Sequence, residues 1–134
     1  MKNNSQSIIA CLTLLLSLLP VRASGDWISF LEDSNGDKWW YDSERISKID
    51  QSNEALIWAR ILFAQPPPNG DKSSKMKLKI RCDLGFLTFM QIWFYNDSKW
   101  TYVTSYQLKP SEEKIVPTPD SGFSMLSKIA CEGS

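Results

Sequence analysis

Apolar and polar side chains alternate without interruption between residues 75 and 82. The polar positions of this segment are all cations, namely Lys75, Lys77, Lys79 and Arg81. The apolar positions are Met76, Leu78, Ile80 and Cys82. A period of two is typical of a β-strand that is buried on one face. The pattern therefore predicts a strand over residues 75–82, with its cysteine on the buried face.

Further segments have the β-branched and aromatic content that is typical of strands. They cover residues 26–31, 38–42, 54–65, 86–95 and 100–107. Asn35-Gly36 predicts a hairpin turn between the first two, because both residues tolerate positive φ. The segment 54–65 is apolar on both faces apart from Arg60, which favours a central strand covered on both sides. A helix is the alternative for this segment, and residues 47–53 are expected to form a loop.

A short C-terminal helix is predicted over residues 122–130. Its apolar stripe consists of Phe123, Leu126, Ile129 and Ala130, and Asp120 or Ser121 can cap its start. A helix this short needs a docking surface to persist. The fold class is therefore α+β and mainly β, with about six antiparallel strands and the helix packed on one face. Two of the strands are apolar on both faces, and one short helix covers only one face. A partly closed barrel or a dimer would shield the other face from water.

The N-terminal residues 1–23 have the pattern of a secretory signal peptide. Lys2 precedes an apolar run from Ile8 to Leu19, and small residues stand before Ser24. This run is too short to span a bilayer, and a buried N-terminal helix is the alternative. Lipidation of Cys11 is rejected because that residue lies inside the run. Residues 24–134 are then expected to form a single exported domain without a stable membrane span.

Two cysteines stay in the exported chain, Cys82 and Cys131. A pair of cysteines in an exported protein predicts a disulfide, because the compartment is oxidising. The bridge would join the end of the predicted helix to the buried face of strand 75–82. Loop-closure entropy gives about 4 kcal/mol of stabilisation for a loop of this length.

Several kinds of chemistry are disfavoured by composition. The chain has no histidine, which removes the usual general base and the commonest metal ligand. The expected disulfide would occupy both cysteines, and the glycines form no phosphate-binding loop. Asp33, Asp37, Asp42 and Glu44 lie in turns or at strand ends, where solvated carboxylates are common. We therefore expect no enzyme, no cofactor and no metal site, and a net charge of +0 gives no case for nucleic acid.

Two features are candidates for binding. The row of Lys75, Lys77, Lys79 and Arg81 could meet an anionic partner such as a glycan. Alternatively, the row is only the solvated face of a strand, where lysines discourage edge-to-edge pairing with another chain. Trp39 and Trp40 are adjacent, so on a strand they face opposite ways. Trp40 is the candidate for an exposed ring that stacks on sugar or lies in a protein interface.

Scattered single residues carry a family resemblance along residues 26–132. They are Trp27, the Tyr41-Asp42 step followed by Ile46, Trp58, and the cysteines Cys82 and Cys131. Together they resemble the surface-adhesin protein E family of Gram-negative bacteria. The resemblance implies a curved antiparallel sheet, with a C-terminal helix tethered to its concave face by a disulfide. It also implies an adhesin that binds host matrix or serum proteins and can dimerise, without indicating which residues bind.

The functional expectation joins these observations. It is an exported, non-enzymatic, adhesin-like binding domain in the periplasm or at the cell surface of a Gram-negative bacterium. Its expected partner is a host protein, with an anionic glycan and a second copy of the chain as further candidates. The alternative is an envelope structural or inhibitor-like protein whose partner is another bacterial protein.

Overall fold

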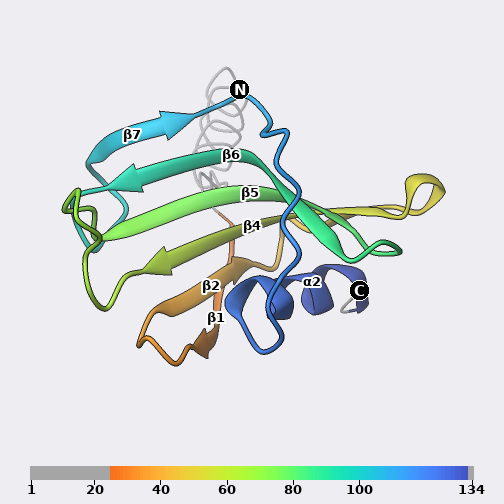
Figure 1. Cartoon of the computed structure of the whole chain (residues 1–134), viewed down its shortest axis with the longest axis horizontal. Coiled ribbons are helices and arrows are strands. Elements are labelled where there is room, and N and C mark those ends of the chain that lie inside the picture. Colours follow the sequence, from red (N-terminus) through yellow and green to blue (C-terminus); the bar gives the residue numbers. More distant parts are fainter. Residues whose placement is uncertain (1–24, 133–134) are drawn as a thin grey trace, which may run out of the picture.

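The computed structural model describes residues 25–132, and these form one antiparallel sheet with a helix across one face (Figure 1). The neighbouring strands are, in spatial order, β1 (Trp27–Glu32), β2 (Lys38–Asp42), β4 (Glu54–Leu62), β5 (Ser73–Arg81), β6 (Phe86–Tyr95) and β7 (Val103–Gln107). A short strand, β3 (Ser47–Ile49), pairs with β4 off this path. The helix α2 (Gly122–Glu132) packs against β3, β4 and β5. The predicted fold class is confirmed.

The hairpin between β1 and β2 is closed by a carboxylate as well as by a glycine. Asp33 accepts hydrogen bonds from the backbone N–H groups of Asn35 and Asp37, at 2.9 and 3.0 Å. Its second oxygen accepts a hydrogen bond from the indole N–H of Trp39 at 3.0 Å. Gly36 has φ 85°, which is the conformation that glycine adopts without strain. Asp33 is therefore a structural turn residue.

The hydrophobic core lies between the sheet and α2, on the side that we call the inner face. Alternate residues of β4 and β5 are buried there, as a period of two requires. The core consists of Trp39, Ala55, Ile57, Ala59, Ile61, Met76, Leu78, Ile80, Leu87, Leu126 and Ala130. Phe123 and Ile129 pack against it. The predicted apolar stripe of the helix is therefore the surface by which the helix docks.

Two local features hold α2 in place. Ser121 caps the helix, since its hydroxyl accepts a hydrogen bond from the N–H of Ser124 at 3.2 Å. At the other end, the predicted disulfide joins Cys82 to Cys131, whose Cα atoms are 5.8 Å apart. The cap thus stabilises the first turn of the helix, and the disulfide fixes its last turn to the residue that follows β5.

Some sequence-based boundaries were wrong. Residues 47–53 were expected to form a loop, but Ser47–Ile49 pair with β4 before a 3-10 turn over Asp50–Ser52. The three side chains of β3 are exposed, so no burial pattern marks it as a strand in the sequence. The last strand was predicted to begin at residue 100, but it begins at Val103. Trp100 has φ 53°, which no strand residue adopts.

The strand order ends at β1 on one side and at β7 on the other, so the described sheet is open and does not form a barrel. Within residues 25–132, no helix is long and apolar enough to cross a membrane. The predicted signal peptide, including Cys11, lies outside the described residues.

Candidate functional site

The face of the sheet opposite α2, here called the outer face, carries a row of aromatic and cationic residues. Strand register places Trp40 beside Arg60, Arg60 beside Lys75, and Lys75 beside Trp93. Because neighbouring strands keep the same side chains on the same face, the row crosses four strands. All tryptophans except the buried Trp39 belong to this surface. We call it the tryptophan face and define it as Trp27, Trp40, Trp58, Trp93 and Trp100, together with Arg45, Arg60, Lys75 and Lys77.

Arginine side chains lie between the rings at one end of the tryptophan face. The guanidinium carbon of Arg60 is 4.1 Å from the ring centroid of Trp27 and 4.8 Å from that of Trp100. The guanidinium carbon of Arg45 is 4.8 Å from the ring centroid of Trp58. These distances are within the range of cation–π attraction. Arg60 is therefore held between two indoles from segments far apart in the sequence.

Lysines and stacked rings continue the pattern toward β6. The Lys75 ammonium is 5.1 Å from the ring centroid of Trp93 and 5.9 Å from that of Trp58. Lys77 is also 5.9 Å from the ring centroid of Trp58. The rings of Trp58 and Trp93 stack, with centroids 5.7 Å apart and planes inclined by 23°. These side chains cover the second face of the central strands, which explains how β4 can be apolar on both sides in an open sheet.

Trp100 reaches this face from a tight turn. It donates indole hydrogen bonds to the carbonyls of Ser74 and Ile61, at 3.1 and 3.3 Å. Its ring lies edge-on to that of Trp40, with centroids 5.3 Å apart. A bulky residue at positive φ is strained, and such strain needs support from its surroundings.

Asp97 supplies that support for the turn. Its carboxylate accepts hydrogen bonds from the backbone N–H groups of Lys99, Thr101 and Tyr102, at 3.0 to 3.2 Å. The hydrogen bond from Tyr102 is the first cause that holds the pKa of Asp97 below its usual value. An ionised Asp97 therefore fixes the backbone from which Trp100 projects.

The electrostatics of the tryptophan face are dominated by cations. Burial lowers the pKa of Lys75, and the nearby charges of Arg60 and Arg45 lower it further. Burial also lowers the pKa of Arg60. The buried carboxylate of Asp42 forms an ion pair with Arg45 and accepts the backbone N–H of Glu44 at 3.0 Å. The charge of Asp42 therefore acts on Arg45 and Arg60, at one end of the row.

The structure divides the predicted basic row into two pairs. Lys75 and Lys77 belong to the tryptophan face, where Trp40 joins them. Lys79 instead lies 3.6 Å from a carboxylate oxygen of Glu54, and Arg81 lies 3.2 Å from one of Asp83. Trp40 is half-buried, so it is less exposed than the sequence suggested.

Sequence reasoning missed Arg45, Arg60 and the other rings of this surface. Trp58 and Arg60 alternate with the buried residues of β4. This alternation along the sequence could have placed both of them on the outer face. Nothing in the local pattern of Trp100 indicated that it would fold back onto the sheet.

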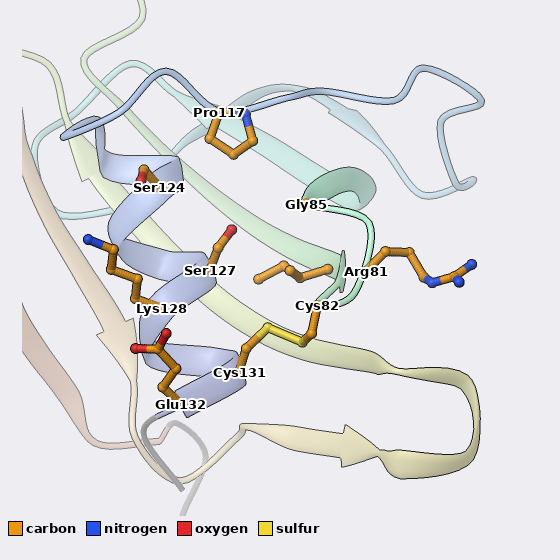
Figure 2. A pocket seen from close by; sticks show the side chains of 10 residues that line it. Arg81, Cys82, Gly85, Pro117, Ser124, Ser127, Lys128, Cys131 and Glu132 are labelled. Atoms are coloured by element: carbon orange, nitrogen blue, oxygen red, sulfur yellow. A yellow bond between two sulfur atoms is a disulfide. The ribbon is translucent and has the colours of Figure 1, made fainter.

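A separate hollow of about 270 Å³ lies beside the disulfide on the helix side (Figure 2). Ser124 and Ser127 of α2, Gly85 and Pro117 contribute to its lining. Figure 2 shows that the side chain of Arg81 points away from the helix. Among the described residues, no group of three or more His, Cys, Asp or Glu side chains could hold a metal ion.

Solved structures of Haemophilus influenzae protein E share this fold. Crystal form II of that protein is 20% identical, with a TM-score of 0.57, and the match covers 85% of this chain and 93% of that chain. Another H. influenzae protein E structure is 20% identical, with a TM-score of 0.56 and coverage of 85% and 89%. Protein E from non-typeable H. influenzae is 21% identical, with a TM-score of 0.50 and coverage of 84% and 78%. No protein-family model and no curated protein matches the chain. The resemblance to protein E is thereby confirmed at the level of the fold.

Proposed function

We propose that this protein is an exported, non-enzymatic, adhesin-like binding domain of the Gram-negative cell envelope, acting in the periplasm or at the cell surface. Its expected partners are proteins of the host matrix or serum, bound through the tryptophan face. The observation that carries the proposal is the tryptophan face itself, a broad aromatic and cationic surface on an open sheet. The fold shared with protein E and the sequence resemblance to its family support an adhesive role.

The residues of this surface suit contact rather than catalysis. Tryptophan and arginine are the side chains most enriched at the energetic centres of protein interfaces. They offer large contact areas, and here their mutual packing holds them in place before any partner arrives. Such preorganisation reduces the entropy that binding costs. The carboxylates near this surface are engaged in structural contacts, as Asp42 and Glu54 illustrate.

Solid-phase binding of the purified protein to a panel of matrix and serum proteins tests the proposal. The test variant carries Lys75→Ser and Lys77→Ser, and the control carries Lys128→Ser, which removes a charge from an exposed position of α2. We expect the wild type and the control to bind and the double variant to lose most of its binding. Fractionation of the producing cells should find the protein in the periplasm or at the surface.

Failure of the wild type to bind any host protein would contradict the adhesive role. Recovery of a bacterial envelope protein in pull-downs, together with that failure, would instead favour the structural or inhibitor-like alternative.

A further inference from the structure

Positive charge is concentrated on the tryptophan face in a way that costs stability in the free protein. Arg60 and Lys75 are direct cross-strand neighbours, and like charges in such a pair are destabilising. The nearby charges that act on Lys75 are those of Arg60 and Arg45, and both oppose its protonated form. Lys79 and Arg81, on the same strand, each have a carboxylate partner. An anion from outside the chain would relieve the repulsion that Arg60 and Arg45 exert on Lys75.

The spacing of these cations suits an extended anion. Lys75 and Lys77 are two residues apart on β5, which places their attachment points about 6.6 Å apart along the strand. Arg60 lies one strand across, about 4.8 Å away. The cations therefore form a two-dimensional array on an open face instead of converging on one point. Such an array matches a chain with repeated negative groups better than a single phosphate ion.

The tryptophan rings indicate which kind of anionic chain would bind this surface. Trp58 and Trp93 stack on one another and are partly exposed beside Lys75 and Lys77, so a ligand unit should carry both an apolar group and an anion. A sugar ring with a sulfate group has both, since its C–H face can lie on an indole while the sulfate meets an ammonium. An anionic membrane fits less well, because the rings are half-buried and packed on one another. Interfacial tryptophans must reach into the headgroup layer.

We propose that the tryptophan face binds a sulfated glycan chain of the kind carried by matrix proteoglycans. Arg60, Lys75 and Lys77 contact the sulfate groups, and the indoles beside them contact the sugar rings. The inference rests on the function proposed above and names the part of the host matrix that this surface recognises.

Heparin is the probe for the first test. We expect the wild-type protein to elute from immobilised heparin at higher salt than from a sulfopropyl cation exchanger, because the exchanger has sulfonates but no sugar rings to stack on indoles. Lys75→Ser with Lys77→Ser should weaken binding to heparin oligosaccharide by about tenfold or more. Lys128→Ser should bind as the wild type does. Heparin oligosaccharide should also change the tryptophan fluorescence of the wild type.

Several results would overturn the inference. They are equal elution from heparin and the sulfopropyl exchanger, unchanged heparin binding by the double variant, and binding to anionic phospholipid vesicles without binding to heparin oligosaccharide. Thermal unfolding of each variant shows whether any lost binding reflects lost folding.

Matrix treated with heparin lyase separates this inference from the function on which it rests. Binding that survives removal of the glycans would leave the adhesive role intact and overturn the sulfated-glycan ligand. Absence of binding to untreated matrix and to heparin would overturn both. We expect binding to untreated matrix and its loss after the lyase.

Discussion

The two faces of β4 and β5 share one backbone and carry opposite chemistry. On the inner face, Ile57 is the cross-strand neighbour of Leu78, and both are completely buried. One residue further along, Trp58 is the neighbour of Lys77 on the outer face, where both are half-buried. The inner pair gains its stability from the removal of apolar surface from water. The outer pair combines partial burial with cation–π attraction, and its polar groups are left within reach of a ligand.

The side chains of the inner face stabilise the fold, and those of the outer face are available for binding. Full burial of an aliphatic side chain contributes about 1.5 to 3 kcal/mol, whereas an exposed cation–π contact contributes about 0.5 to 1 kcal/mol. Substitutions on the inner face should therefore change the free energy of unfolding, and substitutions on the outer face should mainly change binding.

Removal of the disulfide should have the largest effect on stability. Cys82→Ser together with Cys131→Ser should lower the free energy of unfolding by about 4 kcal/mol, because the bridge closes a loop with a sequence separation of 49. Urea denaturation followed by circular dichroism measures the loss. Reduction of the wild type should reproduce it, and heparin binding by the protein that stays folded should be unchanged. A variant as stable as the wild type would show that packing alone docks the helix.

Gly122→Ala should destabilise the inner face although alanine is the better helix former. A Cβ atom at this position would lie 2.2 Å from Cε2 of Trp39, so the helix or the indole must move. Overpacking of this kind costs about 1 to 3 kcal/mol. Chemical denaturation compares the variant with Ser127→Ala on the same helix, which should change stability by less. An increase in stability for Gly122→Ala would mean that α2 does not approach Trp39 so closely.

Period-two patterns explain why most of the inner face could be predicted from sequence. The strand over 75–82, the helix stripe around Leu126 and the cysteine pair are local signals that agree with one another. Each of them reports burial against a single neighbouring layer. The short β3 was missed because its three side chains are exposed, so no alternation of buried and exposed positions marks its pairing with β4.

The tryptophan face could be predicted only in part. Lys75, Lys77 and Trp40 were candidates because each stands out within its own segment. Arg45 and Trp27 join them through contacts between segments that no local pattern reports. Trp100 depends on a turn at positive φ held by Asp97, so the sequence pattern placed it in a strand.

Arg60→Lys should destabilise the outer face moderately while keeping its charge. The planar guanidinium lies against Trp27 and Trp100, and an ammonium cannot stack in the same way. The expected loss of unfolding free energy is about 1 kcal/mol. Arg81→Lys is the matched control, since Arg81 pairs with Asp83 at the surface and such pairs contribute little. Equal unfolding free energies for the two variants, measured in urea, would show that the stacking of Arg60 adds nothing.

Lys75→Met should have the smallest effect on stability and a large one on binding. The substitution removes ring contacts at 5.1 and 5.9 Å, but it also removes a charge that burial, Arg60 and Arg45 disfavour. These contributions oppose each other, so the free energy of unfolding near neutral pH should change by less than about 0.5 kcal/mol. Isothermal titration with heparin oligosaccharide should nevertheless show weaker binding.

The pH dependence of the same variant shows whether its charge was under repulsion. The pKa of Lys75 is lowered in the folded protein from the value of 10.5, so between the two pKa values the unfolded chain binds more protons. Wild-type stability relative to Lys75→Met should therefore rise as the pH increases toward 10.5. Bound heparin should shrink this rise, since an anion beside Lys75 moves its pKa back upward. A flat difference in unfolding free energy between pH 8 and 10.5 would place Lys75 in ordinary solvent, and the outer face would then lack the charge repulsion that an anionic ligand relieves.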